Sequence, residues 1–146
     1  MGLVHAITEV LTTMGTAAPD LVGAMLSILR PTAKDLDAIF VRGSVRRDPE
    51  PLPAVTVPGV ARTVVRFADA GSLVRPPSGF DRRYATIAQF LAPGPLWATF
   101  VYLDAEGRPL ASFDGLVLRR DRWCWCPRPW SFLGAPVATA LNHWTF

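Results

Sequence analysis

The residues best suited to chemistry in this 146-residue chain lie in one run, Trp123-Cys124-Trp125-Cys126-Pro127-Arg128-Pro129-Trp130. If the run begins as a β-strand, Trp123 and Trp125 share one face, and Cys124 and Cys126 share the other. Exposed indole rings beside a guanidinium group can recognise a peptide, a sugar or a base by stacking and cation–π contact. The candidate binding residues are therefore Trp123, Trp125, Arg128 and Trp130.

Two alternatives apply to the same run. The cysteines could form half of a Cys2His2 metal site with His5 and His143. However, zinc sites usually space their cysteines by two or more residues, and the two histidines lie at opposite ends of the chain. We therefore expect Cys124 and Cys126 to be small buried residues, with no metal and no cofactor. Core packing is the alternative for the tryptophans, which are more often buried than exposed.

A single acid is the candidate catalytic group. Asp114 precedes Gly115 in the middle of an expected strand, where aspartate is a poor strand former. In a cone-shaped fold this carboxylate would face an apolar cavity as a general base with a raised pKa, with Tyr84 or His143 as its proton partner. The alternative is a β-bulge marked by Gly115. We take Asp114 and Tyr84 as the candidate catalytic residues.

Arginine clusters at residues 46–47, 82–83 and 119–122 raise the question of nucleic-acid contact. An aspartate adjoins each cluster and partly cancels its charge, and the sequence has no nucleic-acid-binding motif. Phosphate-binding loops, dinucleotide fingerprints and the common hydrolase motifs are also absent from the sequence. We therefore expect no nucleic-acid partner and no nucleotide-dependent reaction.

The composition favours binding over catalysis. Apolar residues make up 50% of the chain, including five Trp and eight Phe. A small domain has a limited interior, so part of this surface is expected to face a protein partner or a second copy, or to line a pocket for a small apolar ligand. The leading hypothesis is a non-enzymatic binding or accessory domain that acts through apolar and aromatic surface.

Location follows from the cysteines and from the apolar runs. Two cysteines are too few for a disulfide framework, which favours a reducing, cytoplasmic setting. The longest apolar run, residues 21–29, is too short to span a bilayer. The N-terminus differs from a signal peptide, because no Lys or Arg precedes its apolar stretch and Glu9 interrupts that stretch. We therefore expect a cytoplasmic protein without a membrane partner.

The elements that position these residues are predicted from apolar spacing and from breakers. Helical spacing predicts helices over residues 3–14 and 19–29. A capping box at Thr32 and Asp35 predicts a third, short helix that ends near Gly43. Residues 43–60 hold four prolines and predict a non-helical connection.

The second half of the chain reads mainly as β-structure. Strands are predicted at residues 61–67, 96–103, 110–119 and 122–126, with a short helix over 83–91. Short turns join the last three strands, which predicts a meander. We therefore expect one α+β domain, with N-terminal helices on one face of a curved antiparallel sheet. Its parts are residues 1–42 (helical), 43–60 (connection), 61–130 (mainly β) and 131–146 (C-terminal tail).

Several segments carry a resemblance. They are Arg30-Pro31-Thr32 with Asp35 and Ile39-Phe40; Tyr84 with Ile87-Ala88; Pro93-Gly94 with Trp97; Phe113-Asp114-Gly115-Leu116-Val117; and Arg122-Trp123 with Trp125, Pro127, Arg128, Pro129 and Trp130. This set resembles an uncharacterised bacterial family of small α+β proteins over residues 22–130, with a departure at Cys124 and Cys126. The layout also resembles the nuclear-transport-factor-2-like fold. That resemblance implies the alternative function, a small-ligand binder or an isomerase or cyclase-type enzyme with an acid in an apolar pocket.

Overall fold

A computed structural model describes residues 2–16, 19–41, 45, 57–120 and 122–133. The helices of the N-terminal part are α1 (Gly2–Thr16), α2 (Pro19–Leu29) and α3 (Ala33–Ile39). A fourth helix, α4 (Arg83–Ile87), precedes most of the sheet. Short 3-10 helices follow β1, α4 and β4: η1 (Ser72–Val74), η2 (Ala88–Phe90) and η3 (Pro129–Phe132). The predicted helices are confirmed, with small shifts at their ends.

The strands form a four-stranded antiparallel sheet in the order β1-β2-β3-β4. Their bounds are β1 (Arg62–Asp69), β2 (Leu96–Leu103), β3 (Pro109–Arg119) and β4 (Arg122–Trp125). Every strand therefore pairs with its neighbours in the sequence. This arrangement confirms the predicted meander and the mixed α+β class.

One face of the sheet packs against α1 and α2. Ile7, Leu11 and Met14 of α1 join Phe100 and Tyr102 of β2 in one buried apolar cluster. The Tyr102 hydroxyl group donates a hydrogen bond of 2.6 Å to the backbone oxygen of Leu11, so the helix and the strand are joined by a buried polar contact as well.

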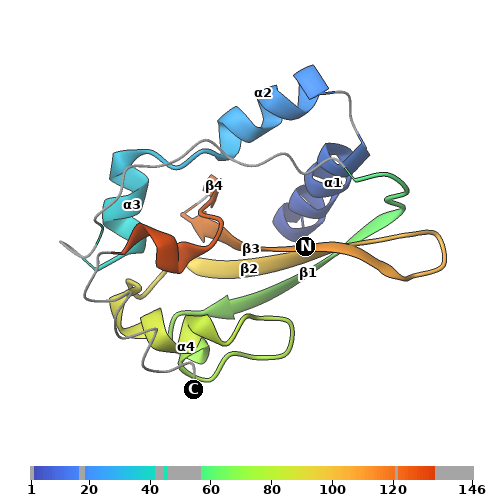
Figure 1. Cartoon of the computed structure of the whole chain (residues 1–146). Coiled ribbons are helices and arrows are strands. Elements are labelled where there is room, and N and C mark those ends of the chain that lie inside the picture. The colour runs from blue at the N-terminus through green and yellow to red at the C-terminus, as the bar shows by residue number, and fades with distance from the viewer. Residues whose placement is uncertain (1, 17–18, 42–44, 46–56, 121, 134–146) are drawn as a thin grey trace.

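The other face is covered by α3, α4 and η3, which corrects the expectation that helices cover one face only. Ile39 of α3 and Ile87 of α4 share a second buried cluster with Trp97 and Val117 of the sheet. Figure 1 shows α1 and α2 on one side of the sheet and α4 on the other. Most aromatic side chains are therefore buried between layers on both sides.

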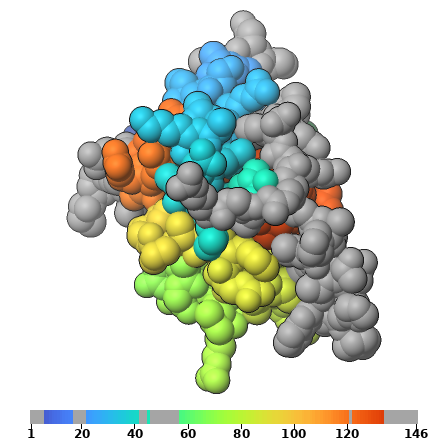
Figure 2. All heavy atoms as spheres, turned by 90° about the vertical axis from the view of Figure 1, so that its left-hand side faces the viewer, coloured from blue at the N-terminus to red at the C-terminus, as the bar shows by residue number. Residues whose placement is uncertain are grey.

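Helix α3 begins at the capping box that the sequence predicts, and ion pairs connect it to the sheet. The backbone N–H of Asp35 donates to Thr32 Oγ1 over 3.1 Å, and the backbone N–H of Thr32 donates to Asp35 Oδ2 over 2.9 Å, which completes the capping box. Asp35 also forms ion pairs with Arg119 and Arg122, 3.0 and 3.1 Å long. In Figure 2 the β3–β4 turn (orange) lies against α3 (cyan).

The helices differ from membrane spans in length and character. Within the described ranges, none is both long enough and apolar enough to cross a bilayer.

Candidate functional site

The strand pair β2–β3 is interrupted at Asp114. Ala98 pairs with Leu116 and Phe100 pairs with Phe113. Thr99, the single β2 residue between them, therefore lies opposite both Asp114 and Gly115. Two residues opposite one are a β-bulge, and the φ of +85° at Gly115 is a conformation that favours glycine. The bulge that the sequence offered as an alternative for Asp114 is therefore confirmed.

Three hydrogen bonds with residues outside the bulge hold its backbone in place. The backbone N–H of Gly115 donates to the Tyr84 hydroxyl oxygen over 2.8 Å. The backbone N–H of Cys126 donates to the Gly115 carbonyl over 2.7 Å. The indole N–H of Trp125 donates to the Asp114 carbonyl, also over 2.7 Å. The backbone of the bulge is thus fixed from both faces of the sheet, which fixes the position of the Asp114 side chain.

Asp114 faces a cavity of about 250 Å³ on the side of the sheet that carries α4. The loop before α4 forms one wall of this cavity, and β2 and β3 form the other. The lining residues are Gly79, Phe80, Asp81, Thr99, Val101, Ser112, Phe113 and Asp114. Because four of them bear side-chain oxygens, the cavity is largely polar, which corrects the expectation that Asp114 would face an apolar pocket.

The Asp114 carboxyl group is half-buried and has few hydrogen-bond partners among the described residues. Its Oδ1 accepts one hydrogen bond of 3.1 Å, from the backbone N–H of Arg128. In the described part of the chain, Oδ2 has no hydrogen-bond donor and no cation forms an ion pair with the carboxylate. Burial raises the pKa of Asp114, and the nearby Asp81 charge raises it further, against the lowering effects of the Arg128 N–H and of the Arg83 and Arg128 charges.

Asp81 lies in the same cavity but is fully paired. The Arg83 side chain donates to both of its oxygens, over 3.1 and 2.9 Å. These hydrogen bonds lower the pKa of Asp81 below its usual value. The Arg83 guanidinium also lies over the Trp130 ring, 4.1 Å from its centre, which holds it in place. The two acids therefore differ: Asp81 forms an ion pair with Arg83, whereas Asp114 has no recorded ion pair among the described residues and feels the charges of Arg83 and Arg128 from further away.

Thr99 is the residue that the sequence reasoning missed. It is 4% exposed and forms part of the cavity wall opposite the bulge. Its hydroxyl is buried without a hydrogen-bond partner among the described residues. An unpaired buried hydroxyl costs about 1–3 kcal/mol, so its presence calls for an explanation. The available signal was a lone threonine within the apolar run Leu96–Leu103.

Replacing Thr99 with valine is expected to raise the free energy of unfolding by about 1 kcal/mol, because valine has nearly the same shape and removes the unpaired hydroxyl. Urea unfolding followed by tryptophan fluorescence measures this change. Thr63→Val on β1 is the matched control: this residue is 7% exposed, and its hydroxyl lies 2.6 Å from the Thr12 hydroxyl. The control should lower stability by about 1 kcal/mol. If both variants lose stability equally, Thr99 has a partner.

The other candidate catalytic residue, Tyr84, lies beneath the bulge and outside the cavity lining. It is fully buried, and its pKa is raised by burial and by the charge of Asp114. Its hydroxyl accepts the Gly115 N–H. The structure thus brings Tyr84 and Asp114 close together, and the hydrogen bond recorded for the Tyr84 hydroxyl is with the backbone of Gly115. A catalytic role for the pair stays a prediction.

The four candidate binding residues are divided between the core and the surface. Trp125 is 1% exposed and Trp130 is 7% exposed, whereas Arg128 is exposed. Trp123 is half-buried and packs against Phe67, with ring centres 6.1 Å apart. The four residues therefore do not form one exposed platform, and a role in binding stays a prediction.

Cys124 and Cys126 are buried on the face of the sheet opposite Trp125, as the strand alternation predicted. The side chain of His5 and all of His143 lie outside the described residues. Among the residues that are described, no group of three or more His, Cys, Asp or Glu side chains could hold a metal ion.

A second hollow lies beside α4, η1 and η2. It has a volume of about 660 Å³ and is lined mainly by small and apolar side chains, including Ala70, Val74, Ala88, Leu91 and Pro93. Val74 is 60% exposed at this hollow, which we call the α4 groove.

Comparisons with known proteins give no match: no family model, no curated protein and no solved structure is similar to this chain.

Proposed function

We propose that this protein is a binding domain for a small polar ligand, which it holds in the Asp114 cavity. The observation that carries the proposal is the mainly polar lining of this cavity, where the half-buried Asp114 carboxyl, with one recorded hydrogen-bond donor among the described residues, lies with Asp81 and Ser112. A ligand with hydrogen-bond donors would pair with the Asp114 and Ser112 oxygens.

Binding is favoured over catalysis by the surroundings of Asp114. A general base needs a proton partner or a reacting group within hydrogen-bond reach. Tyr84, the expected partner, does not line the cavity, and its hydroxyl oxygen accepts the Gly115 N–H. The small-ligand branch of the alternative drawn from the nuclear-transport-factor-2-like resemblance is therefore the one we retain. We also propose that the protein belongs to the bacterial family that it resembles and that it is cytoplasmic.

Association through apolar surface is the second candidate function, and the α4 groove is the observation that favours it. The surplus aromatic residues that suggested such surface mostly lie in the two cores. Among the described residues, exposed large apolar side chains occur singly on α1, α2, η1 and β3 and after α3, as Val10, Ile28, Val74, Leu110 and Val41. Sedimentation analysis tests this candidate, since a monomer at micromolar concentration would count against self-association.

A fragment screen tests the proposed function. Small amides, alcohols, amines and carboxylates are added singly to ¹⁵N-labelled protein, and amide shifts are recorded. We expect saturable shifts centred on Thr99, Ser112 and Asp114, and their loss in Asp114→Asn. Asp37→Asn removes the same charge from an exposed position on α3 and should leave binding unchanged. Shifts confined to Val74 and Leu91 would instead favour the α4 groove.

A further inference from the structure

The α4 groove has the size and the floor of a small-molecule site. Its volume of about 660 Å³ lies within the range of about 300–1,000 Å³ that is usual for such pockets. Ala88 and Leu91 are buried members of the apolar cluster under this side of the sheet, whereas Val74 and Ala85 are exposed. The groove therefore has an apolar floor that is backed by packed side chains, and an open rim.

Few polar side chains line the groove. The Thr86 hydroxyl donates a hydrogen bond of 2.7 Å to the backbone oxygen of Arg83, so it is already paired. The Gln89 side chain is exposed, and no hydrogen bond is recorded for it among the described residues. The lining thus suits a mainly apolar ligand whose polar part lies at the rim.

Two arginines adjoin this rim. Arg75 directly follows Val74 and is exposed. Arg82 is also exposed and has helical dihedral angles at the start of α4. Residues 82, 85, 86 and 89 share one face by helical spacing, and the last three line the groove. Arg82 therefore extends the groove-lining face of α4 at its N-terminal end.

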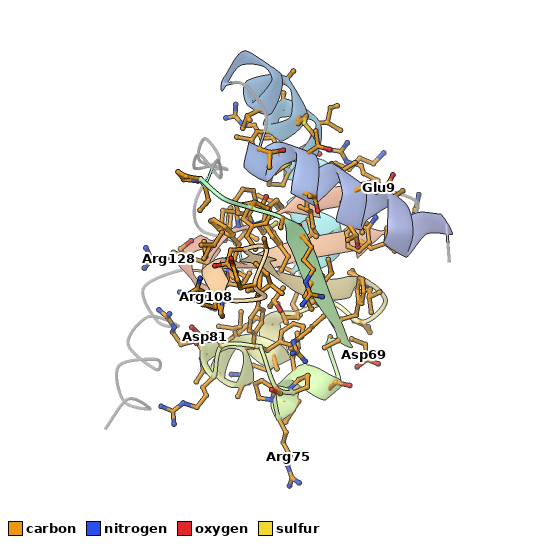
Figure 3. All side chains as sticks on the ribbon, turned by 90° about the vertical axis from the view of Figure 1, so that its right-hand side faces the viewer. Glu9, Asp69, Arg75, Asp81, Arg108 and Arg128 are labelled. Carbon is orange, nitrogen blue, oxygen red and sulfur yellow. The ribbon has the colours of Figure 1, made fainter. Side chains whose placement is uncertain are left out.

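The acids near the rim do not cancel both arginines. Asp81 forms an ion pair with Arg83. Asp69 is exposed and accepts a backbone hydrogen bond of 2.8 Å at the start of η1. Figure 3 shows Asp69 and Arg75 at the same end of the molecule, with the Arg75 side chain extended away from the sheet. Arg75 and Arg82 have no recorded ion pair among the described residues, so the rim carries two cations against one acid.

The surroundings of the groove fit a small molecule better than a second copy of the chain. Stable protein interfaces bury about 800 Å² on each partner around an apolar centre. Val74 is the exposed large apolar side chain at the groove. The others in the described structure lie on different elements, as Val10, Ile28, Val41 and Leu110. The apolar surface is therefore confined to the hollow itself.

We infer that the α4 groove binds alkyl carboxylates, with the alkyl chain on Ala88 and Leu91 and the carboxylate at the rim beside Arg75 and Arg82. Each methylene group that is fully buried strengthens binding about fourfold. An exposed ion pair adds less, about threefold, and determines which sign of charge is preferred. The groove is separate from the Asp114 cavity, so this inference goes beyond the proposed function and does not depend on it.

The test titrates the ¹⁵N-labelled full chain at pH 7 with sodium octanoate, sodium hexanoate and octylammonium chloride. We expect octanoate to give saturable shifts of the Val74, Ala85, Gln89 and Leu91 amides. Octanoate should bind about tenfold more tightly than hexanoate, because two more methylene groups are largely buried. It should bind about threefold or more above octylammonium, which has the same chain length and the opposite charge.

Variants separate the two parts of the site. Ala85→Leu fills the groove and should weaken octanoate binding about tenfold, whereas Ala24→Leu at an exposed position of α2 should not change it. Arg82→Gln should weaken octanoate binding about threefold and reduce the preference over octylammonium. Arg120→Gln removes an exposed cation from the β3–β4 turn and should do neither. If Ala85→Leu fails to fold, the Arg82→Gln pair decides.

Equal affinity for octanoate and octylammonium, or for octanoate and hexanoate, would overturn the inference. Groove shifts that grow with protein concentration in the absence of octanoate would also overturn it, because they would assign the groove to self-association. The Thr99 and Asp114 amides report on the other cavity in the same spectra. Failure of octanoate at the groove therefore leaves the proposed function standing, and an unresponsive Asp114 cavity leaves this inference standing.

Discussion

Gly115→Ala is expected to abolish folding or to lower the free energy of unfolding by about 4 kcal/mol or more. An alanine Cβ at this position would overlap with the backbone carbonyl of Cys126. The φ of +85° adds strain for any residue with a Cβ. The Cys126 N–H donates a hydrogen bond of 2.7 Å to the Gly115 carbonyl, so the two backbone segments cannot move apart without losing the bulge. Circular dichroism and urea unfolding of the purified variant measure the effect.

Gly94→Ala is the matched control for the backbone. Gly94 has a φ of +114°, and no atom within 4 Å would meet its Cβ. This variant should therefore lose only about 1–2 kcal/mol, the cost of the conformation alone. Similar small losses in both variants would mean that the close approach of Gly115 to Cys126, and with it the position of Asp114, is wrong.

Asp35→Asn is expected to lower the free energy of unfolding by about 3 kcal/mol, because it leaves a buried cation without its partner. The Asp35 side chain is 3% exposed and that of Arg119 is 15% exposed, and their atoms lie 3.0 Å apart. Arg122 loses an ion pair with the same carboxylate. The substitution thus weakens the joint between α3 and the β3–β4 hairpin. Urea unfolding at neutral pH gives the size of the loss.

Asp37→Asn serves as the control on the same helix. Asp37 is exposed and lies two residues further along α3. Its replacement should change stability by no more than about 0.5 kcal/mol. A loss in Asp37→Asn as large as that in Asp35→Asn would contradict the assignment of the effect to the buried ion pairs.

The effect of Asp35→Asn should also depend on pH. Burial acts to raise the pKa of Asp35, but hydrogen bonds from the Thr32 backbone and from Arg122 outweigh it and lower the pKa below its usual value. A carboxyl group whose pKa is lowered by folding stabilises the native state above its unfolded pKa, and this contribution is lost as the pH falls through the folded pKa. The gap between wild type and variant should therefore close at acid pH.

Local signals in the sequence were sufficient for most elements of the fold. The capping box at Thr32 and Asp35 fixed the start of α3, and proline and glycine separated the strands of the meander. The bulge could also be predicted from the sequence, because Asp114 and Gly115 are both poor strand formers. These features depend on neighbours in the chain, so they can be read without knowledge of the tertiary structure.

The coverage of both faces of the sheet was missed, although β2 carried the signal. Leu96–Leu103 is apolar at almost every position, and all seven residues other than Thr99 would suit either face of a buried strand. Continuous apolar strands are typical of sheets that are covered on both sides. The order of the elements, with helices first and the meander last, instead predicted helices on one face.

The composition of the cavity depends on contacts that are remote in the sequence. Thr99 meets Asp114 only through the register of β2 and β3. Asp81 joins them through the loop before α4, and Arg83 then neutralises Asp81 from the start of that helix. Neither the register nor the path of this loop can be read from periodicity, so the sequence identified Asp114 and missed its surroundings.

At the proposed ligand site, Asp114 must be a half-buried carboxyl group to which the described residues provide one hydrogen-bond donor. A ¹³C NMR titration of the Asp114 carboxyl, assigned by comparison with Asp114→Asn, tests this requirement directly. We expect the titration midpoint to lie above the ordinary value for an aspartate, because burial disfavours the charged form. A midpoint at or below that value would mean that Asp114 is solvated or paired, and the proposed ligand site would lose its basis.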